Sequence, residues 1–159
     1  MLKGFMVVFV TILFMAGSPV FSYSANVNEE QAVNIVATAC EDIQKDATGT
    51  LAKITNGEEP YTFAGDESLY VFVYDLDINI VAHPNKSLVG RNYKGKPDVR
   101  GKNFRDAIVK GAIKNGSGWE EYYYQKPGET GIHRKKTYYR LVKGSNGKQY
   151  VAACGVYQN

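Results

Sequence analysis

The chain has 159 residues, of which 44% are hydrophobic and 13% aromatic, and 12 of them are tyrosines. This length suffices for one domain with a sizeable core. The formal net charge is +3 at pH 7, and it falls by one when the N-terminal segment, which contains Lys3 and no acidic residue, is removed. This net charge is close to neutral and does not imply a nucleic-acid surface, so no nucleic-acid partner is expected.

Residues 1–24 have the pattern of a secretory signal peptide. Lys3 gives a positive start, residues 5–16 form an apolar core, and small residues precede a cleavage site before Ala25. We therefore expect the mature protein, residues 25–159, to be periplasmic or secreted. The alternative is an uncleaved N-terminal membrane anchor, although the apolar run is short for a spanning helix and is interrupted by a glycine and a proline.

Two cysteines, Cys40 and Cys154, stand far apart in the sequence. In an oxidising compartment two such cysteines are expected to form a disulfide, which would tie the first helix to the last strand. The alternative is two separate buried thiols. The sequence contains no C-x-x-C or C-x-x-C-H motif, so neither a redox centre nor covalent haem is indicated, and no cofactor is expected.

The mature chain begins with a predicted helix near Asn28, where Asn28 and Gln31 have the spacing of a capping box. Apolar residues then recur every three or four positions as far as Ala47, and a weaker helical pattern continues to Asn56-Gly57. The stretch 69–84 predicts two short strands about a turn, because it is rich in aromatic and β-branched residues on either side of Asp and Asn.

After this strand pair come an irregular span at 85–101, long enough to be functional, and a helix near 102–114. Three strands follow, near 119–125, 136–142 and 149–156, and the last two are joined by an Asn-Gly turn. The order of elements predicts an α+β fold: a five-stranded antiparallel sheet with its helices on one side. The face near the central helix and the long loop is then a natural ligand site.

Nothing in the sequence indicates an enzyme. The two histidines, His83 and His133, lie far apart, and the G-x-S-x-G and H-E-x-x-H motifs are absent. No metal site is predicted either. Asp75, Asp77 and Asn79 have the spacing that opens an EF-hand loop, but Ile80 and Lys86 stand where that loop needs Gly and Glu, so a hairpin turn is the better interpretation.

The tyrosines favour a binding module. Tyr122 and Tyr124 share one face of their predicted strand, and Lys136 and Tyr138 share one face of the next. A cation at the edge of an aromatic pocket suits a small carboxylate, with tyrosine hydroxyls as further donors. The alternative is that these are half-exposed strand residues whose lysines simply face solvent.

Several blocks of the sequence are characteristic as a set: LYVFVYDLDINIVAHPNKSLVGRN, FRDAIVKGAIKNGSGWEEYYYQKP, KKTYYRLV and VAACGVY. Over residues 29–157 the chain resembles the single Cache domain, the PAS-like extracytoplasmic ligand-binding domain of bacterial chemoreceptors and sensor kinases. The resemblance implies a long N-terminal helix against a five-stranded antiparallel sheet, with a shorter helix between strands 2 and 3. It also implies binding of small metabolites, commonly short organic acids, without catalysis.

By matching position, the resemblance places the ligand pocket at Tyr74, His83, Trp119, Tyr122, Tyr124, Lys136 and Tyr138, with Phe72 and Arg105 as further candidates. Lys136 would pair with the ligand carboxylate, and His83 and the tyrosines would donate hydrogen bonds. The sequence departs from the family pattern at Ile78, where Gly is usual and Asn79 is expected to take up the turn strain, and at Tyr124, where Trp is usual.

Cache domains usually continue into a membrane helix and a signalling domain, and here the sequence stops at Asn159. The expectation is therefore a stand-alone sensor domain for a small organic acid. It would act in signal transduction or chemotaxis through a membrane receptor or sensor kinase. The alternative is a protein-interaction module of the cell envelope that keeps the fold and has lost the ligand.

Overall fold

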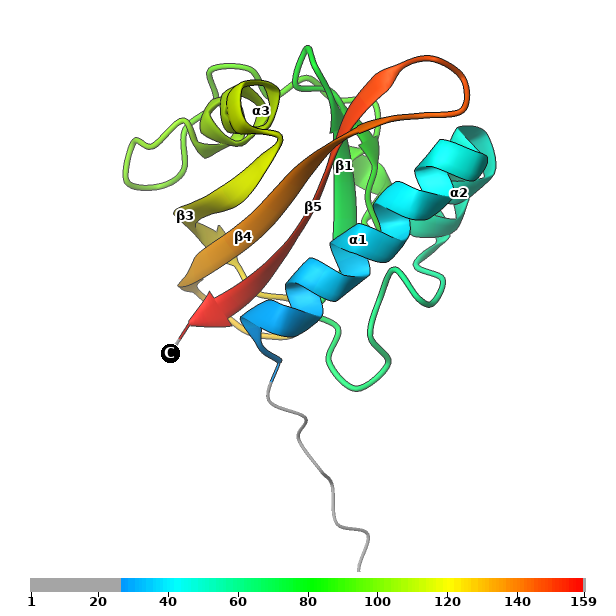
Figure 1. Cartoon of the computed structure of the whole chain (residues 1–159). Helices are drawn as coiled ribbons and strands as arrows, with labels where there is room; N and C mark the ends of the chain where they lie inside the picture. Colours follow the sequence, from blue (N-terminus) through cyan, green and yellow to red (C-terminus); the bar gives the residue numbers. More distant parts are fainter. Residues whose placement is uncertain (1–26, 159) are drawn as a thin grey trace, which may run out of the picture.

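The computed structural model describes residues 27–158, in which three α-helices and one five-stranded sheet are connected by loops (Figure 1). The predicted signal peptide, residues 1–24, lies outside this range. Within the described range no helix has both the length and the apolar character required to cross a membrane. The elements are α1 (Glu29–Lys45), α2 (Ala47–Asn56), β1 (Val71–Asp75), β2 (Ile80–Ala82), the short 3-10 helix η1 (Lys86–Leu88), α3 (Phe104–Asn115), β3 (Ser117–Gln125), β4 (Ile132–Lys143) and β5 (Gln149–Gln158).

The sheet has the strand order β2-β1-β5-β4-β3, and every neighbouring pair is antiparallel. This confirms the predicted α+β fold with its five-stranded antiparallel sheet and the shorter helix between strands 2 and 3. The last strand of the sequence is the central strand of the sheet, and its residues 150–156 are all buried. A strand covered on both faces is apolar at consecutive positions, which explains the run YVAACGV.

The helices cover both faces of the sheet, so the prediction that they lie on one side is wrong. Alternate side chains of a strand point to opposite faces. Val71 and Val73 of β1 accordingly join the core under α1 and α2, whereas Phe72 and Tyr74 join the core under α3. Both sets of side chains are apolar, so each face of the sheet must be covered by a helix.

The capping box predicted for the first helix is present. The Asn28 side chain accepts a hydrogen bond from the Gln31 amide at 2.9 Å, and the Gln31 side chain accepts one from the Asn28 amide at 2.9 Å. The helical pattern then breaks at Asp46, which ends α1 and begins α2 as its N-cap. Its side chain accepts a hydrogen bond from the Gly49 amide at 2.9 Å. The weak continuation of the pattern is therefore a separate helix.

The turn between β1 and β2 is held by Asp75, whose Oδ1 accepts hydrogen bonds from the amides of Asp77 at 3.0 Å and Asn79 at 2.9 Å. Its carboxylate is thus committed to the turn, as the hairpin interpretation requires. The positive φ of this turn lies at Ile78, at 68°, and not at Asn79 as predicted. Ile78 is a β-branched residue in a conformation usually left to glycine, and its side chain is buried in the core under α3.

Candidate ligand-binding site

Aromatic side chains gather between α3 and the sheet. Phe104 of α3 stacks on Tyr122 of β3, with 3.7 Å between ring centroids and 10° between ring planes. Tyr74 is buried beside them. Together these rings surround an inner cavity of about 20 Å³, which is room for about one water molecule. We call its lining the aromatic cage; it consists of Tyr70, Phe72, Tyr74, Ile80, His83, Phe104, Arg105, Tyr122, Tyr124 and Lys135.

Lys135 of β4 is the first of two cations in this cage. Lys135 is only 1% exposed, and its ammonium donates a hydrogen bond to the Tyr70 hydroxyl at 3.1 Å. The same ammonium lies 4.3 Å from the centre of the Tyr70 ring and 4.6 Å from that of Tyr157. Ring faces stabilise a cation, but they leave its charge uncompensated.

Arg105 of α3 is the second cation. It is 7% exposed, and its guanidinium lies 4.2 Å from the centre of the Phe104 ring and 4.4 Å from that of Tyr93. One terminal nitrogen donates to the Lys96 carbonyl at 3.3 Å. The Nε atom is buried and has no hydrogen-bond partner in the part of the chain that the structure describes. Such an unpaired buried donor is costly and calls for an explanation.

The cage contains no acidic side chain to balance these two charges. Within residues 27–158, neither Lys135 nor Arg105 forms a salt bridge. Buried charges in proteins are normally paired, because desolvation makes an isolated one expensive. The arrangement therefore provides an aromatic compartment that favours an anion.

His83, which follows β2, contributes a neutral donor to the cage. Its ring lies 5.1 Å from that of Tyr70 and stacks on Phe72 at 6.1 Å. The Nδ1 atom accepts a hydrogen bond from the Asn85 amide at 2.9 Å, so in the neutral ring the proton is on Nε2. Burial, reinforced by the charges of Lys135 and Arg105, lowers the pKa of His83 to about 4.

This shift makes a specific prediction for the pH dependence of stability. The pKa of His83 is about 4 in the native state against 6.5 in the unfolded chain, so the unfolded state takes up the proton first as the pH falls. The stabilisation is complete above pH 6.5 and is lost between pH 6.5 and about 4. We expect His83→Gln to remove about 2–3 kcal/mol of the fall in unfolding free energy between pH 7 and pH 4.5.

Denaturant titrations of the two proteins at both pH values measure this difference. The other ionisable groups are common to both proteins, so their contribution cancels. Equal losses of stability in the wild type and the variant would show that His83 is readily protonated in the folded protein.

A second, larger cavity of about 920 Å³ lies outside the cage and is open to solvent. We call it the outer cleft. Five cage residues, Tyr70, His83, Phe104, Arg105 and Tyr124, line both spaces. The remaining lining comes from the α2–β1 loop, the segment 84–88, the η1–α3 loop, and the ends of β3 and β4 with the turn between them. A molecule in the outer cleft therefore contacts Arg105, which is one of the two cations of the cage.

The structure brings together six of the nine residues that the sequence analysis assigned to the pocket. Tyr74, His83, Tyr122, Tyr124, Phe72 and Arg105 all line the cage. The other three, Trp119, Lys136 and Tyr138, are on the opposite face of the sheet, where Trp119 and Tyr138 pack against the core under α1. The prediction that all nine share one pocket is therefore wrong.

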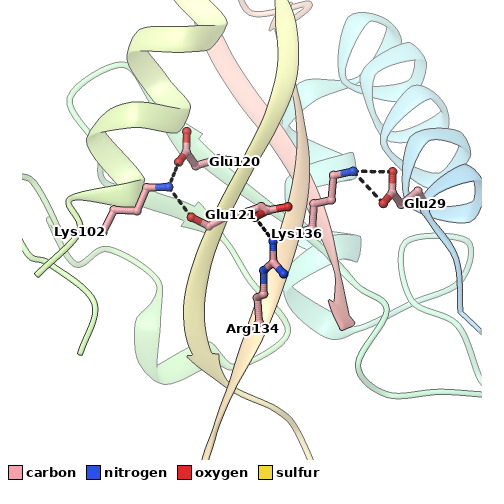
Figure 2. A network of polar contacts seen from close by, with 6 residues as sticks. All are labelled: Glu29, Lys102, Glu120, Glu121, Arg134 and Lys136. Carbon is pink, nitrogen blue, oxygen red and sulfur yellow. Dashed lines mark hydrogen bonds and ion pairs between the residues drawn. The ribbon is translucent and has the colours of Figure 1, made fainter. Parts of the chain in front are cut away.

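Lys136 in particular does not face the cage. Its ammonium contacts both carboxylate oxygens of Glu29, in the first turn of α1, at 2.8 Å, and lies 4.9 Å from the centre of the Trp119 ring. Figure 2 shows this side chain reaching toward α1, and it also shows the ion pair between Arg134 of the same strand, β4, and Glu121 of β3. Lys136 is thus used to hold α1 on the sheet, and the lysine of the cage is its neighbour Lys135.

The sequence analysis missed three cage residues that carry much of its chemistry: Lys135, Tyr70 and Phe104. Strand alternation could have found Lys135, because Tyr122 and Lys135 are direct partners across β3 and β4. Paired residues in an antiparallel ladder lie on the same face. That signal depends on the register of the hairpin, which the sequence left open.

The predicted disulfide is not formed in the structure, where Cys40 of α1 and Cys154 of β5 are free thiols. Both are buried in the core between α1 and the sheet. Burial raises the pKa of Cys40 to about 11 and that of Cys154 to about 12, so both thiols are protonated at neutral pH. They pack as small apolar side chains.

Fold and site together define an antiparallel α+β domain with an aromatic cage between α3 and the sheet and a ligand-sized cleft beside that cage. The sequence model of the Cache domain family matches residues 32–159. The chain belongs to this family. The curated proteins contain no match to it.

Several solved structures have the same fold as this chain. One is a Cache chemosensory domain whose structure was described as the basis for carboxylic acid recognition; it has 21% sequence identity and a TM-score of 0.65, covering 82% of this chain and 92% of that one. A periplasmic sensor domain of a chemotaxis protein has 25% identity and a TM-score of 0.62, covering 82% and 90%. A methyl-accepting chemotaxis protein from Vibrio parahaemolyticus RIMD 2210633 has 16% identity and a TM-score of 0.62, covering 81% and 87%.

Proposed function

We propose that this chain is an extracytoplasmic sensor domain that binds a small carboxylate from the outer cleft, with the carboxylate group at the aromatic cage and Lys135 and Arg105 as its two cationic partners. The observation that carries the proposal is the pair of buried cations without an acidic partner in the cage. A carboxylate supplies the missing charge and accepts several hydrogen bonds at once. His83 and the Tyr70 hydroxyl are further donors for the same group.

The low dielectric of the cage strengthens this recognition. Charge-assisted hydrogen bonds to a carboxylate are about twice as strong as neutral ones, and they are weakened little by salt when water is excluded. The Nε of Arg105 offers a donor that no group of the described residues, 27–158, accepts from. A guanidinium presents its donors as a planar fork that matches a carboxylate, so this atom is a natural partner for one carboxylate oxygen.

The fold neighbours support a sensory role. A Cache chemosensory domain with the same fold was described as recognising carboxylic acids, and another neighbour is a periplasmic sensor domain. The proposal extends this ligand class and this location to the present chain because its own cage has the complementary charge. We further propose that residues 1–24 direct export and that a receptor or sensor kinase carries the signal onward.

The experiment that tests the proposal is isothermal titration of the purified protein at pH 7 with butanoate, butanamide and butylamine. These three ligands have nearly the same shape and differ in charge. We expect butanoate to bind at least 30-fold more tightly than the other two, because they leave the two cations unpaired. Equal affinities, or no binding by butanoate or by any longer carboxylate, contradict the proposal and favour a protein-interaction module that has lost its ligand.

A further inference from the structure

The two cavities differ greatly in size. The cage holds about 20 Å³ and the outer cleft about 920 Å³. Sites for ligands of drug size occupy about 300–1,000 Å³, so the outer cleft is far larger than a two- or three-carbon acid requires. Because Arg105 and Tyr124 line both spaces, an anionic group at the cage has the outer cleft directly beside it.

The outer cleft is bordered by exposed apolar side chains. Val99, in the loop before α3, is 69% exposed, and Ile132, at the start of β4, is 47% exposed; both line the cleft. Within residues 27–158 only one other large hydrophobic side chain is comparably exposed, that of Ile113 on α3. Phe63 and Leu88 add further apolar surface to the lining. Grouped exposed apolar residues commonly mark a binding surface.

The carboxylates of the cleft do not provide a site for an ammonium group. Asp98 accepts hydrogen bonds from the amides of Arg100 at 2.8 Å, Lys102 at 3.0 Å and Tyr123 at 2.9 Å. Its oxygens are therefore committed to the backbone around them. Glu67 is the other acidic residue of the lining, and it is exposed to water.

We infer that the ligand is an extended monocarboxylate with an apolar tail of several carbons and no ammonium group. This inference rests on the carboxylate site proposed above. The carboxylate lies at Arg105 and Lys135, and the tail lies along the outer cleft against Val99 and Ile132. A tail in this position removes apolar surface of both the ligand and the protein from water.

Titration calorimetry with acetate, butanoate, hexanoate and octanoate tests the inference. We expect the affinity to rise up to fourfold for each added methylene while the tail fills the cleft, so that hexanoate binds up to about 250-fold more tightly than acetate. We also compare L-leucine with 4-methylpentanoate, which has the same carbon skeleton without the ammonium. L-Leucine should bind at least tenfold more weakly.

Variants of the cleft show where the tail binds. In Val99→Ser/Ile132→Ser we expect a clearly smaller gain per methylene and an unchanged affinity for acetate, whereas Ile113→Ser should keep the full gain. All three positions are exposed, so these proteins should fold normally, and thermal melts verify this.

The possible outcomes separate this inference from the proposed function. If acetate binds as tightly as hexanoate, or L-leucine as tightly as 4-methylpentanoate, the extended ligand is excluded and the carboxylate site stands. An unchanged gain per methylene in the double variant excludes the cleft as the site of the tail. If no carboxylate of any length binds, the proposed function itself fails.

Discussion

Lys135→Met is expected to weaken carboxylate binding strongly while leaving the protein as stable as the wild type or more stable. Lys135 is 1% exposed, and within residues 27–158 its ammonium has one hydrogen-bond partner, the Tyr70 hydroxyl. Burying an ammonium without an acidic partner costs free energy, and a methionine of similar length fills the same space without that cost. Loss of one partner of a buried charged contact weakens binding by about 2–5 kcal/mol, or at least about 30-fold.

Lys136→Met is the matched control, because it makes the same replacement one residue further along β4. Lys136 is on the other face of the sheet and pairs with Glu29. A partly exposed ion pair contributes about 0–1 kcal/mol, so this variant should lose a little stability and keep its affinity for butanoate. Calorimetry measures the affinity of both variants for butanoate, and denaturant unfolding measures their stability. A large loss of stability in Lys135→Met, or equal losses of affinity in the two variants, would falsify the assignment.

Gly155→Ala is expected to destabilise the protein by about 1–3 kcal/mol, which corresponds to a fall in Tm of roughly 5–10 °C. Gly155 is buried in the central strand, and a Cβ there would lie 2.3 Å from the Thr137 hydroxyl and 2.4 Å from Cε of Lys135. The glycine thus makes room for the lysine stem on its way to Tyr70. Its replacement should also weaken butanoate binding, since Lys135 is displaced.

A double-mutant cycle separates this steric effect from a general intolerance of β5. Lys135→Ala removes two of the three atoms nearest to the new methyl group, Cε and Cγ of Lys135, and leaves only the contact with the Thr137 hydroxyl. The combined loss of stability in Lys135→Ala/Gly155→Ala should therefore be smaller than the sum of the single losses by more than 0.5 kcal/mol. Strict additivity would show that the clash with Lys135 is not the cause.

Most of the fold can be predicted from local patterns in the sequence. The apolar run that opens residues 69–84 identifies a strand buried on both faces, and the Asn28–Gln31 pair marks the start of α1; both are present in the structure. The Asn146-Gly147 pair lies in the turn between β4 and β5, where Gly147 adopts a φ of 79°. These features depend on residues near one another in the chain, which is why they were predictable.

The site was only partly predictable because it depends on strand register. Alternation along a strand shows that Lys135 and Lys136 point to opposite faces, but not which of them faces α3. That choice is fixed by the pairing of Tyr122 with Lys135. The intervening turn, residues 126–131, has no sequence signal that sets its length, and an error of one residue moves every side chain to the other face.

The position of the strain in the first hairpin could not be predicted for a similar reason. Asn tolerates a positive φ better than a β-branched residue does, so Asn79 was the natural choice. In the structure the amide of Asn79 donates a hydrogen bond to Asp75, and the side chain of Ile78 is buried in the core under α3. Burial in the tertiary structure outweighs the local preference at this position.

The proposed binding of an anion at the cage would also affect the lifetime of the protein. A bound anion stabilises only the folded state, by an amount that grows with its concentration relative to the dissociation constant. Where proteases act on the transiently opened chain, degradation follows the free energy of unfolding. Under this proposal we expect a cell supplied with the ligand to hold more of this protein than a starved one, at an equal rate of synthesis.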